Sequence, residues 1–513
     1  MATVLVRKSA TVSFKGFGGM TMKARPVEKS PGVNLYEEVA NRIQSLIKEG
    51  TLKPGDRIPS VRKMHQQMSV SITTVLEAYR LLEDRGLIVA RPQSGYYVRH
   101  ILSLPPAEPT SSTPPGLACN VDISMAFRIN TVLGEPGMIK LGAAVPDPEL
   151  FPLAALNRLM GQVMRQNPEV CHSYNALPGL EPLRHEVARR LMDAGCSLTP
   201  DQILIVNGTT EGMYLSLRAI TKPGDTVAIE SPSYYGLLEI LQSLHLKALE
   251  LPTHPREGLS LPDLENALSQ GQVAACAIVS NFSNPLGSCM EDSKKKALVE
   301  ILENYDIPLV EDDVYGDLGF DEMRPKAIKA FDKKGLVLYC SSSSKTISPG
   351  LRVGWVVAGR YQKTVEQLKL FTNIVTAAAN QLTIAAFLAN GGYDRHLRHL
   401  RRAYGEQVLR MTQAICDYFP PETKVTRPTG GHVLWVELPP HFNAIALYQE
   451  AYKRQISIAP GTMFSASGNY RNCFRLNCGL LWSPKIQIAM QILGELIANQ
   501  DYDTTRLRPV FLA

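Results

Sequence analysis

The sequence predicts an α/β protein of two units, a small helical module with a hairpin followed by a large unit with a mostly parallel sheet. Three observations lead to this prediction. The chain has 513 residues, more than the roughly 150 of a typical domain. A proline-rich stretch interrupts it just after residue 100. Beyond that stretch, short apolar runs alternate with helical patterns, as expected for a parallel sheet with helical crossovers.

Composition excludes several classes of protein. Hydrophobic residues make up 45% and charged residues 20% of the chain, which is typical of folded water-soluble domains. The longest uninterrupted apolar run, Val273 to Val279, is far shorter than the roughly 18 residues of a membrane helix. Nine cysteines without a CxxC pair indicate neither a disulfide framework nor a zinc site. We therefore expect a cytoplasmic protein with no membrane or metal partner.

The basic excess lies entirely in the first hundred residues. Residues 1–30 carry six Lys or Arg and one acidic residue, and residues 31–100 carry ten and seven. Together they have a net charge of +8, so the chain's total of +6 leaves −2 for the other 413 residues. This asymmetry favours a polyanion partner for the N-terminal end. A solvated basic face would give the same count.

Composition also divides the chain into four segments. Residues 1–30 lack the apolar core of a secretory signal and predict a flexible basic extension. Residues 31–100 form the small module. Residues 101–121 contain a Pro, Ser and Thr-rich run, which predicts a semi-rigid connector reaching on the order of 40 Å. Residues 122–513 form the large unit.

Seven apolar runs of the large unit predict its sheet. They are residues 202–206, 226–229, 247–251, 274–279, 308–310, 336–340 and 352–357. Helical patterns such as 213–220 and 296–302 lie between them, so we expect helices on both faces. Ligands of such sheets bind beyond the carboxyl ends of the strands. Further strands at 432–438 and 473–477 predict a smaller C-terminal α/β subdomain.

The small module predicts three helices and a hairpin. Residues 35–46 keep helical spacing, and Ser60 and Ser71 are placed to cap a second and a third helix. The runs 87–91 and 96–98 then pair across a turn. Because Val75, Tyr79 and Leu82 share one face of the third helix, this face should pack inside the module.

Polar side chains of this module suit DNA. Small hydroxyl side chains in the first turn of a helix let it enter a major groove, and arginine and amide side chains suit phosphates and base edges. The candidate DNA-binding residues are Arg62, Ser71, Thr73, Thr74, Arg91 and Gln93. A packing module with a basic face would have the same architecture, so architecture alone leaves both alternatives open.

The run from Leu52 to Val98 resembles the winged helix-turn-helix of the GntR family of bacterial transcription regulators. It contains PGDR-PS-R, S-TV-AY--LE--G and a wing ending in SG-Y-V, in that order. The resemblance implies that the module binds a double-stranded DNA operator.

The large unit holds a lysine in an informative context. Lys345 ends the run SSSSK and is followed by the run PGLR at 349–352. A lone lysine after a serine-rich loop would carry little information. Here three motifs precede it, each after a predicted strand: Asn207-Gly208-Thr209-Thr210, Asn284-Pro285-Leu286-Gly287 and Glu311-Asp312-Asp313-Val314-Tyr315.

Together these motifs resemble the cofactor site of class I/II aminotransferases, which have the fold type I of enzymes that use pyridoxal phosphate (PLP). The resemblance covers residues from about 135 to 500. A GntR winged helix joined to such a domain resembles the MocR subfamily of GntR regulators.

The resemblance implies a role for each motif residue. Lys345 would form a Schiff base with the cofactor and then shuttle a proton. Asp312 would pair with the pyridine nitrogen, in preference to Asp313, because Tyr315 falls three residues after Asp312. Tyr315 and Asn284 would donate hydrogen bonds to the ring's phenolate oxygen.

The resemblance also implies the phosphate and substrate contacts. Helix-opening and charged donors would bind the phosphate, namely Gly208, Thr209, Thr210, Ser342 and Arg352. Tyr174 would reach this phosphate from the other subunit of a homodimer, and Tyr234 would stack on the ring. Arg475 would bind the α-carboxylate of an amino compound. Ala144 stands where the family often has glycine, which would narrow the substrate pocket.

These features predict a PLP-dependent transcription regulator, associated with the nucleoid, whose large unit binds an amino-compound effector. The alternative is an active amino acid aminotransferase with an accessory DNA-binding domain, because the sequence retains the full catalytic set. A third reading has the N-terminal unit bind protein rather than nucleic acid.

Overall fold

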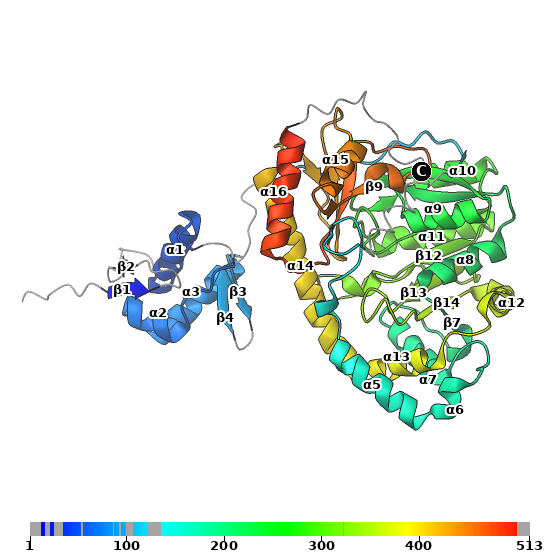
Figure 1. Cartoon of the computed structure of the whole chain (residues 1–513), viewed down its shortest axis with the longest axis horizontal. Coiled ribbons are helices and arrows are strands. Elements are labelled where there is room, and N and C mark those ends of the chain that lie inside the picture. Colours follow the sequence, from blue (N-terminus) through cyan, green and yellow to red (C-terminus); the bar gives the residue numbers. More distant parts are fainter. Residues whose placement is uncertain are drawn as a thin grey trace, which may run out of the picture. The chain divides into compact units, whose positions relative to one another are not determined.

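The computed structural model describes residues 12–15, 21–24, 34–52, 55–85, 87–91, 94–98, 106–121, 135–321 and 323–499. The chain divides into two compact units, Met1–Pro105 and Pro106–Ala513 (Figure 1). Within the described ranges, no helix has both the length and the apolar character needed to cross a membrane.

The first unit contains the predicted helices and hairpin. Its elements are α1 (Leu35–Lys48), α2 (Val61–Met68), α3 (Ile72–Asp84), β3 (Ile88–Arg91) and β4 (Gly95–Val98). The Ser60 and Ser71 hydroxyls accept hydrogen bonds from Lys63 N at 3.3 Å and Thr74 N at 3.0 Å, which confirms both predicted caps. Val75, Tyr79 and Leu82 are fully buried. The Tyr79 ring lies 4.8 Å from that of Tyr96 and so packs α3 against the hairpin.

Two short strands lie within the segment for which we predicted a flexible extension. β1 (Val12–Lys15) pairs antiparallel with β2 (Thr21–Ala24). Apolar Val12 and Phe14 alternate with polar neighbours, which is the two-residue period of a strand. The prediction therefore does not hold for these two strands, because it weighed the basic charge above that alternation.

The second unit is built on a nine-stranded sheet. Its strands are β5 (Cys119–Asn120), β7 (Leu204–Val206), β8 (Thr226–Ser231), β9 (Lys247–His254), β10 (Gly258–Leu259), β11 (Ala275–Ile278), β12 (Leu309–Asp312), β13 (Val337–Ser342) and β14 (Gly354–Val357). The order is β10-β9-β8-β11-β12-β13-β14-β7, with β5 paired to β9. The five strands from β9 to β13 along this path are parallel to one another. In contrast, β14 is antiparallel to both of its neighbours, and β10 and β5 are antiparallel to β9. All seven predicted strands are present. The other two have only two residues each and show no period in the sequence.

Helices cover both faces of this sheet, as predicted. Alternate residues of β8 point to opposite faces, so Val227 packs with residues of α8 and α9 while Ala228 packs with residues of α10 and α11. The helices of the unit are α5 (Leu153–Gln166), α6 (Pro168–His172), α7 (Glu181–Leu191), α8 (Thr209–Ile220), α9 (Tyr235–Ser243), α10 (Leu261–Ser269), α11 (Asp292–Tyr305), α12 (Gln362–Asn373), α13 (Ala378–Ala389), α14 (Gly392–Tyr418), α15 (Ala444–Tyr452) and α16 (Pro484–Ala498). Short 3-10 helices are η2 (Pro148–Leu150), η3 (Pro200–Gln202), η4 (Gly316–Leu318), η5 (Ile328–Phe331), η6 (Gly359–Tyr361) and η7 (Gly461–Phe464).

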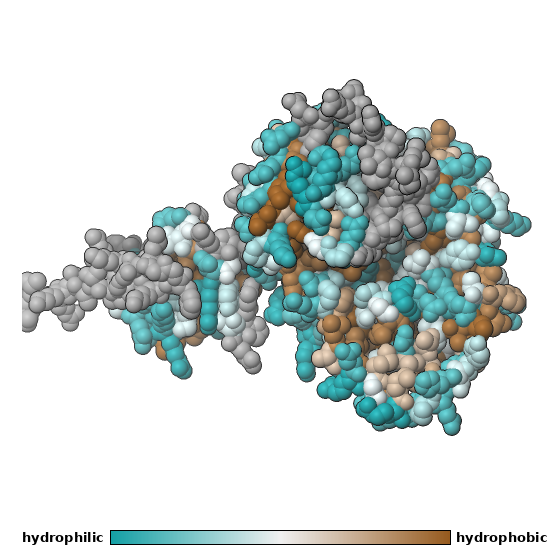
Figure 2. Space-filling view, in the orientation of Figure 1, coloured by the Kyte–Doolittle hydropathy of each residue, from teal (hydrophilic) through white to brown (hydrophobic). Residues whose placement is uncertain are grey.

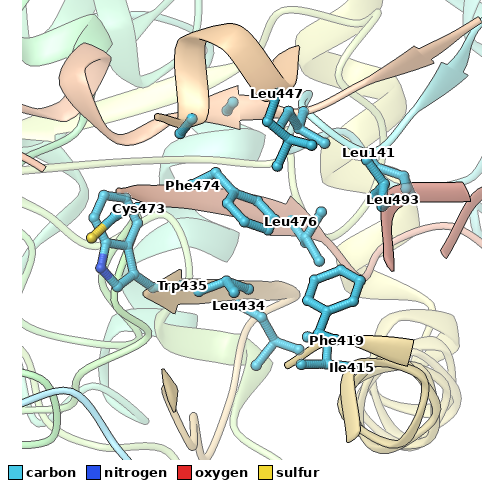
Figure 3. Packing of buried hydrophobic residues seen from close by; sticks show 14 of the residues in the cluster. Leu141, Ile415, Phe419, Leu434, Trp435, Leu447, Cys473, Phe474, Leu476 and Leu493 are labelled. Atoms are coloured by element: carbon cyan, nitrogen blue, oxygen red, sulfur yellow. The ribbon is translucent and has the colours of Figure 1, made fainter. Parts of the chain in front are cut away.

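A smaller subdomain surrounds a four-stranded antiparallel sheet of order β15-β16-β19-β18. These strands are β15 (Lys424–Val425), β16 (Val433–Glu437), β18 (Ala459–Pro460) and β19 (Cys473–Asn477), and β17 (Ile456–Ser457) pairs separately with β6 (Ile139–Lys140). Trp435 and Phe474 lie in its buried cluster, together with Phe419 and Ile415 of the neighbouring chain segment (Figure 3). The predicted C-terminal subdomain and its two strands are confirmed.

Most of the predicted connector, residues 106–121, belongs to the second unit. Val425 N donates to Ala107 O at 2.9 Å, and Ser112 N donates to Thr253 O at 3.1 Å. Further along, Cys119 pairs with Ala248 through β5. Residues 106–121 therefore do not form the separate semi-rigid connector that we predicted, because they bond to strands of the second unit. An extended proline-rich backbone makes no hydrogen bonds of its own, so its free carbonyl and amide groups pair with neighbouring strands.

Candidate functional site

The motif residues of the second unit gather at the carboxyl ends of the parallel strands, where ligands of α/β sheets bind. Asp312 is the last residue of β12 and lies opposite Cys340 of β13. β13 ends at Ser342, three residues before Lys345. Gly208 follows β7 and precedes α8.

Lys345 is positioned by the turn after β13. Its Nζ donates a hydrogen bond to Ala144 O at 2.6 Å and lies 5.8 Å from the centre of the Tyr315 ring. Burial lowers the pKa of Lys345 to about 8, and the charge of Arg475 also lowers it, whereas Asp312 raises it. An amine with such a pKa has a large neutral fraction near physiological pH and is a good nucleophile.

The two neighbouring aspartates have different surroundings. Asp313 accepts hydrogen bonds from Arg324 at 2.5 Å, Tyr339 at 2.9 Å and Asn281 at 2.8 Å, so a structural network occupies its carboxylate. The Asp312 carboxylate instead accepts from the backbone of Val314 at 3.1 Å. Burial raises the pKa of Asp312 to about 7, and a cationic partner would restore its charged form.

Arg475 comes from β19 of the smaller subdomain and reaches the large sheet. Its side chain is fully buried, and its Nη1 donates to Asn284 Oδ1 at 2.8 Å. Its Nη2 donates to Gly142 O. Asn284 also shares a side-chain hydrogen bond with Tyr315. The site therefore lies where the two sheets meet, with side chains from both.

Gly208 and Arg352 form a small cup at the start of α8. Gly208 has a φ of +87°, which favours glycine, and a Cβ there would lie 2.9 Å from Arg352 Cζ and displace that side chain. Arg352 Nη2 donates to Asn207 O at 2.9 Å and Nη1 to Ser344 Oγ at 3.4 Å. With the amino end of α8 and a guanidinium, the cup suits an anion.

Other predicted residues differ in how closely they approach this centre. Ser342 is buried, and its Oγ accepts from Ser344 N at 3.3 Å. Tyr234 is half-buried and close enough to Asp312 and Arg475 for their charges to affect its pKa, which burial raises well above its ordinary value. Thr210 is exposed in the first turn of α8. Tyr174 is 84% exposed, so within one chain it is not part of the cluster.

Sequence reasoning missed His432, which lies under the cluster. Its ring is fully buried, 5.0 Å from the Tyr404 ring and 5.6 Å from that of Tyr315. Burial lowers the pKa of His432 to about 3, so this imidazole is neutral. No motif marked it, because two glycines and an apolar strand surround it in the sequence.

Sequence reasoning also missed a buried ion pair behind the cup. Lys369 of α12 has no exposed side-chain surface, and its Nζ lies 2.9 Å from Glu211 Oε2. Glu211 in turn accepts from Asn207 N at 2.5 Å. The pair thus fixes the residue that precedes Gly208. Its two members are 158 residues apart, so no local pattern could reveal it.

The candidate DNA-binding residues of the first unit lie around the start of α3. Ser71 and Thr73 are exposed, and the Ser71 hydroxyl lies 2.7 Å from the hydroxyls of both Thr73 and Thr74. Arg62 is exposed in the first turn of α2. Arg91 ends β3, while the Arg91 side chain and Gln93 lie outside the described residues.

Comparison with known proteins identifies both units. Residues 137–492 match the family described as "Aminotransferase class I and II". The chain belongs to the class I and II aminotransferase family. Residues 35–98 match the family described as "Bacterial regulatory proteins, gntR family". The combination of this GntR domain with the aminotransferase domain confirms the MocR-like organisation that the motifs predicted.

Relatives of this aminotransferase-family chain include regulators and enzymes. The HTH-type transcriptional regulator YdcR of Escherichia coli (strain K12) is 39% identical over 465 residues, which cover 91% of this chain and 99% of that protein. The 2-aminoadipate transaminase of Thermus thermophilus is 30% identical, and the match covers 71% of this chain and 91% of that enzyme.

The fold of the aminotransferase domain also occurs in solved structures. LysN, the α-aminoadipate aminotransferase of Thermus thermophilus, aligns with a TM-score of 0.68 and 29% identity, over 72% of this chain and 94% of that chain. That enzyme was solved in complex with N-(5'-phosphopyridoxyl)-L-leucine. The mostly parallel sheet and its smaller subdomain are thus the fold type I architecture predicted from the motifs.

Proposed function

We propose that this protein is a PLP-dependent, DNA-binding transcription regulator whose aminotransferase domain binds an amino-compound effector. The observation that carries the proposal is the presence, in one chain, of a GntR domain and a class I and II aminotransferase domain. The match with the HTH-type transcriptional regulator YdcR covers 91% of this chain and 99% of that protein. Such a regulator acts at the nucleoid, in the cytoplasm.

Buried polar atoms in the cluster support the fit of PLP and an amino compound. Within the described part of the chain, Thr209 Oγ1, in the first turn of α8, and Arg475 Nε have no hydrogen-bond partner. A buried polar atom without a partner costs free energy, and a ligand at this site would supply the missing partner. A phosphate would satisfy the first, and a carboxylate would satisfy the second.

PLP supplies an aldehyde that condenses with amines and a ring that withdraws electrons from the amine-bearing carbon. Lys345 Nζ would bind the aldehyde carbon and, once released, would hold and move a proton. Asp312 would hold a proton on the pyridine nitrogen, and Asn284 and Tyr315 would orient the ring by hydrogen bonds to its phenolate oxygen. Tyr234 would stack on the ring and exclude water from it.

The phosphate and carboxylate groups would be held at opposite ends of the cluster. Arg352, Ser342 and the amino end of α8 at Gly208, Thr209 and Thr210 would bind the phosphate by charge-assisted hydrogen bonds. Arg475 would bind the carboxylate of the amino compound through its guanidinium fork. The two ends thus select a compound that bears both an amine and an acid group.

We further propose that the functional unit is a homodimer. Tyr174 and Phe371 are 84% and 83% exposed, and Leu370 and Ile374 are also exposed. Figure 2 shows brown, apolar surface where Figure 1 draws α12. The exposed apolar residues of α12 form a patch of the kind that is typical of a protein interface. If Tyr174 completes the phosphate site of a second copy, mixing Lys345→Ala and Tyr174→Phe variants should restore one intact site per mixed dimer. A monomer in sedimentation would contradict the proposal.

The DNA-binding role is tested by the salt dependence of binding. Full-length protein should bind DNA from upstream of its own gene with an affinity that falls steeply with salt, because Lys and Arg displace counterions from phosphates. Arg62→Ala should lower the slope of the logarithm of affinity against the logarithm of salt concentration by about one. The control Arg80→Ala removes an exposed arginine that pairs with Glu77 on α3 and should leave the slope unchanged. Affinity independent of salt would favour a protein partner instead.

The first turn of α3 also presents an apolar side chain that the sequence analysis did not select. Ile72 is 45% exposed beside Ser71 and Thr73. Apolar side chains in a major groove contact the methyl group of thymine. Ile72→Ala should therefore reduce discrimination between thymine and other bases while leaving binding to nonspecific DNA unchanged.

An active aminotransferase with an accessory DNA-binding domain is the second candidate. The buried Lys345, Asp312 and Arg475 favour it, because a purely structural domain has no need of such groups. A panel of amino acids added to the PLP-loaded protein separates the two functions. A shift in visible absorbance without product indicates sensing. Sustained formation of keto acid with a second amino acceptor would establish turnover and overturn the regulator-only proposal.

A further inference from the structure

Residues 106–112, which we call the strap, begin the second unit and contact both of its sheets. Val425 N of β15 donates to Ala107 O at 2.9 Å. At the other end, Thr253 N of β9 donates to Ser112 Oγ at 2.8 Å. The strap therefore crosses from the smaller subdomain to the edge of the nine-stranded sheet.

One carboxylate in the strap joins the same two parts. Glu108 Oε2 lies 2.7 Å from Arg256 Nε and 2.6 Å from Arg256 Nη2, which is a bidentate arrangement for the guanidinium. Glu108 Oε1 accepts from Arg427 N at 3.2 Å, and Arg427 Nη2 donates to Pro106 O at 2.8 Å. The Glu108 side chain is only 18% exposed, whereas that of Arg256 is 55% exposed.

Both arginines adjoin the loop that carries Asn284. Arg256 O accepts a hydrogen bond from Cys289 N at 2.9 Å. Gly287 has a φ of +74°, and a Cβ there would lie 2.6 Å from Pro428 Cβ, so the loop backbone packs directly against the neighbour of Arg427. Contacts therefore run without a gap from Asn284 to the strap.

We propose that Glu108 is a positioning residue that couples the amino-compound site to the DNA-binding unit, acting through Arg256 and Arg427 on the loop 284–289. This inference rests on the proposed function. A carboxylate bound by Arg475 competes for the guanidinium that now donates to Asn284, so the loop has different contacts with and without the compound. A change in the loop would reach the strap through Arg256 and Arg427. The first residue of the strap, Pro106, is the residue at which the second unit begins.

Coupling of this kind is reciprocal. A ligand shifts an equilibrium only through unequal binding to two arrangements, and each ligand then changes the other's affinity by the same factor. DNA bound by the first unit should therefore alter the strap and the loop 284–289, just as the amino compound should alter DNA affinity. This reciprocity makes double-stranded DNA a usable probe of the strap.

Hydrogen exchange of the full-length, PLP-loaded protein tests the proposal. The variant Glu108→Gln keeps the shape of the side chain but removes its charge, and Arg256→Gln removes the partner charge. The matched control is Glu265→Gln, which changes an exposed glutamate of α10. Exchange is measured at peptides containing Cys289 and Arg427, with and without DNA from upstream of the gene.

Without DNA, both peptides should exchange about fivefold faster in Glu108→Gln and in Arg256→Gln than in the wild type or the control, because the loop opens more often. DNA should change their exchange in the wild type and the control but not in the two strap variants. Equal exchange in all proteins, or a DNA effect that survives Glu108→Gln, would overturn the proposal. If the wild type binds no DNA, the proposed function fails, while the comparison without DNA still decides whether Glu108 positions the loop.

Discussion

The pKa of Lys345 offers a quantitative test of the candidate site. Burial and the Arg475 charge lower the pKa of Lys345 to about 8 from the ordinary 10.5. Only the neutral amine attacks an aldehyde, so at pH 8 about half of the protein is reactive, against about one molecule in 300 for an ordinary lysine. Cofactor-free protein should therefore capture PLP at a rate whose pH midpoint lies near 8.

Two substitutions should move this midpoint in opposite directions. The positive charge of Arg475 disfavours the ammonium form of Lys345, and the negative charge of Asp312 favours it. Arg475→Gln should therefore raise the pKa of Lys345 and shift the midpoint to higher pH, whereas Asp312→Asn should lower both. The assay follows the visible absorbance of bound PLP after mixing, from neutral to alkaline pH.

Two controls identify the reacting group. Lys345→Ala should abolish covalent capture, and Lys296→Ala, which alters an exposed lysine of α11, should leave the profile unchanged. A wild-type midpoint near that of an ordinary lysine, or a shift of the Arg475→Gln and Asp312→Asn variants in the same direction, would refute the electrostatic reasoning.

Three further predictions concern the support of the site. Lys369→Met should destabilise the protein by about 3–5 kcal/mol, because it leaves the carboxylate of Glu211 without its buried partner. In urea unfolding, the double variant Lys369→Met/Glu211→Gln should lose much less stability than the single variant. An equal loss of stability in the single and the double variant would mean that the pair is not coupled. The pKa of His432 is lowered from 6.5 to about 3, so as pH falls through this window the unfolded chain takes up a proton that the folded chain refuses. The unfolding free energy of the cofactor-free protein should thus drop by about 4 kcal/mol more than that of His432→Gln, and parallel pH profiles would contradict this. Gly208→Ala should weaken PLP binding in a fluorescence titration but not pyridoxal binding, because the methyl group would displace Arg352 from the phosphate cup; equal loss for both would place the defect elsewhere.

Local sequence patterns predicted the secondary structure well where they were long or strongly periodic. The caps at Ser60 and Ser71 and the buried face of α3 follow from spacing within one helix, which neighbours in the sequence decide. The strands that end at Asp312 and Ser342 follow from apolar runs bounded by polar residues. The two-residue strands β5 and β10 could not be predicted, because they exist only through pairing with β9.

The strap shows where local reasoning was wrong. Its prolines correctly predicted an extended backbone, since proline removes amide donors and fixes φ. They did not reveal that Ala107 and Ser112 bond to two separate strands, because composition contains no information about distant partners. The predicted extension at 1–30 failed in a similar way, since pairing of β1 with β2 is not visible in its charge.

The sequence by itself determined which residues are candidates for the site and in what order they follow the strands, because motif spacing is a property of the chain. It also determined that a GntR domain precedes an aminotransferase domain. Only the tertiary structure decided how those residues are tuned. Several features depend on burial and on partners far apart in the chain. They are the lowered pKa of Lys345, the hydrogen-bonded carboxylate of Asp313, the buried pair of Lys369 with Glu211, and the contacts of Glu108 with two arginines.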